Sequence, residues 1–195
     1  PSALDKPVPL LIAAYGPKIL HWCGQVADGV ILQVADIETV RWSVEQVHAG
    51  ARAAGRDPGA IRIICATPVA VDEDLHAACD RIRWFPGVLS NHVADMVRRL
   101  PREQAPANLL RLLEEPARYD YREHARRGAH HADSVSDELV AMFGIAGPLD
   151  ACIDKLRRLE AVGVTELCIY YLSTPEAEVA DSARLFSESI IPAFR

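Results

Sequence analysis

The turn formed by Ala14, Tyr15, Gly16, Pro17 and Lys18 holds the residues best suited to bind an anion. An apolar run precedes this turn and an amphipathic stretch follows it, which predicts a strand, a turn and then a helix. The first N–H groups of a helix favour negative charge, so they form a ready site for an anion, typically a cofactor phosphate. Gly16 permits close approach, Pro17 suits the first helical position and Lys18 adds positive charge. An ordinary strand-to-helix turn is the alternative interpretation.

Polar side chains also stand at or near the ends of other predicted strands. Gln33 lies near the carboxyl end of the second strand, where barrel enzymes build their sites, so it is a candidate cofactor contact. A strand-end residue that meets only water is the alternative. Tyr170 and Tyr171 end the last strand, and alternation should send one toward a bound ring and the other under a helix. Thr67 and the following proline are either active-face residues or a bulge without function.

Histidines are the other residues that could do chemistry. The spacing of His124, His130 and His131 does not place three imidazoles on one helical face, and no carboxylate stands at the customary offset. We therefore predict no metal site. Asn91 and His92 are interpreted as a capping turn, with a substrate contact as the alternative. No residue of this chain is predicted to be catalytic.

The elements that must position these residues alternate between apolar strands and amphipathic helices. This pattern predicts a parallel α/β sheet covered on its faces by helices. The predicted strands are 8–14, 30–34, 61–71 and 164–172, and the predicted helices are 19–27, 38–55, 149–161 and 175–186. The stretch 75–143 is too long for one crossover, and its short, proline-broken helical patterns predict an α-helical insertion that covers the site. We expect residues 1–195 to form a single domain.

Composition limits the classes of partner. The chain has 195 residues, half of them apolar, and a formal net charge of −6. That is enough material for one core, and the negative charge without a basic stripe argues against nucleic acid. No stretch is long and apolar enough to cross a bilayer, so no membrane contact is predicted. The five cysteines show no C-x-x-C spacing, which favours buried, reduced thiols in a cytoplasmic protein.

The ordered motifs together resemble a known family. Segments 9–18 and 27–32 are similar to the mid-chain signature of the bacterial luciferase-like superfamily, and more narrowly to its branch that uses the deazaflavin coenzyme F420. Further segments agree with that family, in the right order: Ala53–Pro58, Phe143–Pro148 with Ile153–Val164, and Tyr119–His124 with Arg127–Gly128.

The resemblance implies a fold that this chain supplies only in part. Members of the superfamily are (β/α)8 TIM barrels, and the matching motifs correspond to the C-terminal part, strands five to eight. We therefore expect a fragment of a longer protein, or a chain whose first half is carried separately. Parallel sheets with open edges are liabilities. We expect a homo-oligomer or a complementing chain that supplies the N-terminal half-barrel.

The resemblance also implies an activity. It points to an F420-dependent oxidoreductase that transfers a hydride between the deazaflavin and an unknown small-molecule substrate, with the cofactor phosphate at Gly16, Pro17 and Lys18. Such a transfer needs orientation and exclusion of water more than a strong acid or base. An FMN-dependent monooxygenase and a non-catalytic half-barrel association module are the alternatives. The family's proton-donating residues usually lie on the early strands, outside this chain.

Overall fold

The computed structural model describes residues 8–114, 119–172 and 174–195. Its main sheet holds four parallel strands that stand side by side in chain order. These are β1 (Leu11–Ala13), β2 (Gly29–Leu32), β3 (Arg62–Thr67) and β6 (Glu166–Ile169). A sheet in which each crossover moves one place in the same direction has the strand order of a barrel wall, not of a doubly wound fold. The predicted parallel α/β class is confirmed.

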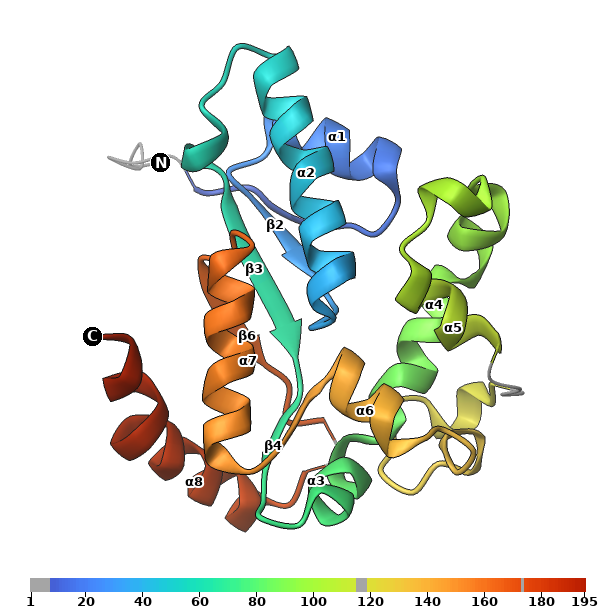
Figure 1. Cartoon of the computed structure of the whole chain (residues 1–195), viewed down its shortest axis with the longest axis vertical. Helices are drawn as coiled ribbons and strands as arrows, with labels where there is room; N and C mark the ends of the chain where they lie inside the picture. The colour runs from blue at the N-terminus through green and yellow to red at the C-terminus, as the bar shows by residue number, and fades with distance from the viewer. Residues whose placement is uncertain (1–7, 115–118, 173) are drawn as a thin grey trace, which may run out of the picture.

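Four helices connect and follow the strands of the main sheet (Figure 1). They are α1 (Pro17–Val26), α2 (Ile37–Ala53), α7 (Leu149–Ala161) and α8 (Glu176–Leu185). All four were predicted, and α7 has the predicted bounds. Gly24 of α1 and Gly50 of α2 let these helices touch, because a Cβ on either would lie 1.9 or 1.8 Å from a carbonyl oxygen of the other helix. This contact fixes helix α1 against α2. The N-terminus of α1 is thereby held at the carboxyl end of β1.

The third predicted strand is wrong in its extent, because Pro68 divides it. Proline has no N–H to donate to a sheet ladder, so the chain leaves the main sheet at this residue. The residues beyond it form β4 (Val69–Val71), which pairs in parallel with β5 (Ile145–Gly147) in a separate two-stranded sheet. Thr67, the last residue of β3, is buried.

The first strand was predicted to be buried over residues 8–14, and this is wrong. Strand β1 is short and forms one edge of the sheet, and Leu11 is 37% exposed. Ile19, Trp22 and Val26 belong to the apolar face of the predicted amphipathic helix, yet each is about half exposed, whereas Cys23 and Ala27 on that helix segment are buried. The three half-exposed side chains share a face that no other element of the described chain covers fully. Their apolar character therefore suits a surface that a further element buries.

The stretch between β4 and β5 is helical over much of its described length. It holds α3 (Leu75–Ile82), α4 (Trp84–Arg99), α5 (Ala107–Glu114) and α6 (Asp137–Phe143). Residues 115–118 of the predicted insertion lie outside the described residues. In Figure 1, α4, α5 and α6 lie on the side toward which the arrows of β2 and β3 point. Shorter helical turns occur at Pro58–Ala60, Arg102–Gln104, Tyr121–Glu123, His130–Ala132, Phe186–Ile190 and Ile191–Phe194.

Lys155 of α7 ties the main sheet's helices to this helical stretch. Its ammonium donates hydrogen bonds to the carbonyl oxygens of Ala141, at 2.6 Å, and Met142, at 2.7 Å, and also to that of Gly144. These carbonyls belong to the C-terminal end of α6, where the helix dipole favours a cation. Burial lowers the pKa of Lys155 to about 8, so the group still carries most of its charge at neutral pH.

Four of the five cysteines are buried and all five are free thiols; Cys168 is exposed. The predicted burial is confirmed for Cys23, Cys65, Cys79 and Cys152 and is wrong for Cys168. Every helix within the described residues is too short or too polar to cross a bilayer.

Candidate cofactor-binding site

The predicted turn lies at the carboxyl end of β1, where α1 begins. Gly16 is the N-cap of α1 in an extended conformation (φ −84°, ψ 149°), and Pro17 occupies the first helical position. The glycine is therefore not required by its backbone angles. A Cβ at Gly16 would lie 3.4 Å from Cγ of Met96 on α4, so the space above the turn is narrow. Ala14 is buried below the turn and Lys18 is exposed beside it.

Three polar side chains, each following a different strand, meet at the carboxyl end of the sheet. The amide of Gln33, after β2, accepts a hydrogen bond from the hydroxyl of Tyr15, after β1. Its Nε2 donates to the hydroxyl of Tyr170, after β6, at 2.6 Å. Helix α4 adds His92, whose Nδ1 lies 3.1 Å from the Tyr15 hydroxyl. The structure thus joins two predicted site residues, Tyr15 and Gln33, in one hydrogen-bonded chain.

A cavity of about 230 Å³ opens over this chain of hydrogen bonds. Tyr15, Gln33, His92, His124 and Tyr170 contribute polar groups to its lining. The other lining residues are aromatic or apolar: Trp84, Phe85, Val88, Leu89, Ala125 and Leu172. Concave sites with apolar walls and a few convergent polar groups are typical of small-molecule binding.

Burial decides the protonation of the polar groups. It raises the pKa of Tyr15 and of Tyr170, so both phenols remain protonated. Burial, together with the nearby His124, lowers the pKa of His92, which keeps that imidazole neutral. The cavity therefore presents neutral hydrogen-bonding groups and no fixed charge at these positions.

The two adjacent tyrosines diverge as predicted. Tyr170 faces Gln33 and the cavity, whereas the hydroxyl of Tyr171 lies 3.0 Å from Oγ of Ser182 on α8. The prediction for His92 was wrong in its structural part, because Asn91 and His92 lie inside α4 and do not cap it. Residues 84, 88 and 92 recur at helical spacing, and that signal could have placed His92 on the aromatic face.

His124, His130 and His131 are the histidines whose spacing in the sequence predicted no metal site. His124 lies with its ring centroid 6.1 Å from that of His92, and its Nδ1 contacts the hydroxyl of Tyr119. His131 is buried with its ring 4.5 Å from that of Tyr119, and neither ring nitrogen has a partner among the described residues. His130 is exposed. His124 and His131 thus both contact Tyr119, whereas His130 is exposed, and the three imidazoles form no metal-ligand group among the described residues.

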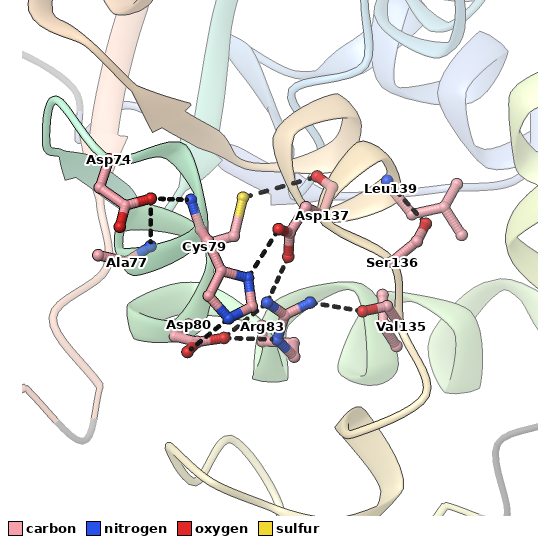
Figure 2. A network of polar contacts seen from close by, with 10 residues as sticks. Asp74, Ala77, Cys79, Asp80, Arg83, Val135, Ser136, Asp137 and Leu139 are labelled. Atoms are coloured by element: carbon pink, nitrogen blue, oxygen red, sulfur yellow. Dashed lines mark hydrogen bonds and ion pairs between the residues drawn. The ribbon is translucent and has the colours of Figure 1, made fainter.

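A different cluster, His76, Asp80 and Asp137, has the ligand types and spacing of a metal site. Figure 2 shows Arg83 between the two carboxylates. Its guanidinium donates to Asp80 at 2.6 Å and also to Asp137, and Asp137 accepts from His76 at 2.8 Å. A guanidinium in this place supplies the positive charge that a metal ion would bring. The cluster is therefore an ion-pair clamp between α3 and the start of α6.

The same region contains the start of helix α6. Ser136 is the N-cap of α6, and its hydroxyl accepts a hydrogen bond from the N–H of Leu139 (Figure 2).

Comparisons with known proteins agree with this architecture. The model of the family described as "Luciferase-like monooxygenase" matches residues 1–166. A 5,10-methylenetetrahydromethanopterin reductase from Methanolobus tindarius is 29% identical over 161 residues, which are 82% of this chain and 47% of that protein. The chain spans about half the length of the curated relatives it matches.

Solved structures show the same fold. The coenzyme F420 dependent tetrahydromethanopterin reductase from Methanopyrus kandleri superposes with a TM-score of 0.69 and 22% identity, covering 96% of this chain and 51% of that one. An F420-dependent secondary alcohol dehydrogenase in complex with an F420-acetone adduct gives a TM-score of 0.69 with 23% identity, covering 98% and 50%. Each of these two structures is about twice as long as this chain.

Proposed function

The chain belongs to the luciferase-like monooxygenase family, and on that premise we propose that it forms part of an F420-dependent oxidoreductase. The enzyme would transfer a hydride between the deazaflavin and an organic small molecule. One observation carries the proposal: the turn at Gly16 and the cavity lined by Gln33 and Tyr170 meet at Tyr15, at the carboxyl end of the sheet. The names of the similar reductase and dehydrogenase favour F420 as the cofactor.

The residues of the turn fit a phosphate. Pro17 leaves the next two N–H groups of α1 as the first free donors, Lys18 brings an exposed positive charge, and Gly16 has no side chain to fill the narrow space beneath Met96. When bound, a deazaflavin supplies the two-electron hydride chemistry itself. The chain's own share is to hold the phosphate, to orient a flat ring against Trp84 and to exclude water.

We also propose that the chain is the second half of a barrel. Strands β1 and β6 each have one neighbour in this sheet, and both margins expose apolar side chains. Beside β6 an apolar groove of about 760 Å³ runs between α7 and the segment after α8, lined by residues such as Leu167, Phe186 and Ile190. Strands one to four of the barrel would cover these margins. They would come from the rest of a longer protein or from a complementing chain. In a homo-oligomer, a second copy of this chain would cover the margins instead. The predicted cytoplasmic location and a dimeric state are part of this proposal.

Titration of the intact gene product with F420 and with FMN tests the proposed function. Micromolar binding of F420, followed by quenching of its fluorescence, is the expected result. Both cofactors present a phosphate to the same turn, so the turn alone does not distinguish them. Preferential binding of FMN would assign the protein to the monooxygenases instead. If neither binds, the non-catalytic association module is the correct description.

A further inference from the structure

We propose that Tyr170 is a hydrogen-bond donor of the cavity, presenting its phenolic proton to a carbonyl oxygen of the bound ligand, and that Gln33 is the positioning residue that fixes this direction. The identity of the ligand rests on the proposed function. The direction of the hydrogen bonds does not, because it follows from the orientation of the Gln33 amide, whose Oε1 faces Tyr15 and whose Nε2 faces Tyr170.

The hydroxyl of Tyr15 has one proton and two hydrogen-bonding neighbours, Gln33 and His92. Oε1 of Gln33 can only accept a hydrogen bond, so it takes the Tyr15 proton. Nδ1 of His92, 3.1 Å from the same hydroxyl, must then act as the donor. His92 is therefore the tautomer that carries its proton on Nδ1 and leaves Nε2 as an acceptor.

The hydroxyl of Tyr170 contacts the other end of the Gln33 amide. Nε2 of Gln33 donates to the Tyr170 oxygen at 2.6 Å, so the oxygen acts as acceptor in that bond and the hydroxyl keeps its own proton. No described residue accepts that proton, and Tyr170 lines the cavity. Burial keeps the phenol neutral, and the ring of Phe85, with its centroid 6.3 Å from that of Tyr170, packs against it edge-on.

A neutral donor among apolar walls selects a neutral acceptor, since desolvating a charged group there would be costly. A carbonyl oxygen on a flat or small apolar ligand meets this requirement. Two molecules of the proposed reaction can supply one: the pyrimidinedione ring of the cofactor and the organic substrate.

The opposite direction is the arrangement to be excluded. If the Gln33 amide were turned over, Nε2 would donate to Tyr15, Tyr15 would donate to Nδ1 of His92, and Tyr170 would spend its proton on Oε1. His92 would then be protonated on Nε2, and Tyr170 could only accept. The tautomer of His92 thus reports the direction of all the hydrogen bonds that join Tyr15, Gln33 and Tyr170.

The first experiment is a ¹⁵N NMR measurement of the His92 tautomer in the full chain. The expected result is the Nδ1–H tautomer. In Gln33→Leu the Tyr15 proton loses its acceptor and turns to Nδ1, so His92 should change to Nε2–H. The control Gln104→Leu, an exposed glutamine, should leave the tautomer unchanged. Nε2–H in the unaltered protein, or no change in Gln33→Leu, overturns the proposal.

The second experiment identifies the source of the carbonyl. Tyr170→Phe is compared with Tyr171→Phe, whose hydroxyl faces α8. The probes are F420, riboflavin (a ring without phosphate) and cyclohexanone. Loss of one hydrogen bond should weaken binding about tenfold. If F420 and riboflavin both weaken, the ring is the acceptor; if only cyclohexanone weakens, the substrate is. Unchanged affinity for all three overturns the proposal. Failure of the unaltered protein to bind F420, FMN or riboflavin contradicts the proposed function instead.

Discussion

Tyr15 links the two parts of the proposed site at the residue scale. Its backbone leads directly into Gly16, and its hydroxyl begins the hydrogen-bonded chain that ends at Tyr170. A ligand with a phosphate at the turn and a flat ring in the cavity would therefore pass over one residue. Sequence reasoning identified Tyr15 and Gln33 from their places after strands. It could not place His92 against Tyr15, because the two residues lie 77 positions apart and only the fold brings α4 to the end of β1.

Lys155 gives a residue-scale prediction about stability. Lys155→Met leaves the carbonyl oxygens at the end of α6 without their donor, and we expect a loss of roughly 2 kcal/mol in the free energy of unfolding. Urea denaturation measures it. Arg158→Met, an exposed position on the same helix, should change the stability by less than about 0.5 kcal/mol. Equal effects of the two substitutions would show that Lys155 has no such role.

At the scale of elements, the helix pair α1 and α2 determines where the turn stands. Their closest approach depends on two glycines that share no obvious motif in the sequence. Helix α7 was predicted with its correct bounds because its apolar spacing and its stop at Gly163 are both local signals. The division of the third strand was missed because Pro68 was weighed as a bulge and the partner of β4, strand β5, lies more than 70 residues away.

The approach of α1 to α2 can be tested with Gly24→Ala. The added Cβ would lie 1.9 Å from the carbonyl oxygen of Val47, so the helices must separate. We expect a destabilisation of about 3 kcal/mol by thermal or urea unfolding, in the upper range for overpacking. Gly59→Ala, where the added carbon would lie 3.4 Å from Asp57, is the control. A stable Gly24→Ala protein would contradict this account of the helix contact.

The clamp between α3 and α6 should depend on pH. Hydrogen bonding to Asp137 and the charge of Asp80 raise the pKa of His76 above its ordinary value of 6.5. A group whose folded pKa is raised stabilises the fold below its unfolded pKa, and this contribution is lost as pH rises through the folded pKa. His76→Asn should therefore destabilise the protein more at pH 5.5 than at pH 8.5. His130→Asn is the control, and an equal effect at both pH values would refute the prediction.

At the scale of the whole molecule, the described residues form a sheet with the strand order of a barrel wall, and apolar side chains are exposed at both of its margins. The family resemblance predicted strands five to eight, but periodicity alone had predicted β1 and the apolar face of α1 to be buried. Apolar patterning shows only that a side chain is buried somewhere, and it does not say whether the covering element belongs to the same chain.

The margins lead to a prediction about assembly. Replacement of Ile19 and Trp22 by lysine should weaken association with a complementing half-barrel or a second copy. Sedimentation of the purified chain over a range of concentrations measures this. Leu75→Lys, on a comparably exposed apolar residue of α3, should leave assembly unchanged. Equal behaviour of both variants would mean that the α1 face is not an association surface.

The central claim is that the turn at Gly16 holds a cofactor phosphate, and one comparison of affinities tests it most directly. Gly16→Val and Lys18→Ala are titrated with F420 and with its phosphate-free deazaflavin core. Because Gly16 has an ordinary negative φ, valine there fills space without straining the backbone. The account predicts at least about tenfold weaker binding of F420 and unchanged binding of the phosphate-free core. Equal losses for both ligands, or no loss for either, would contradict it.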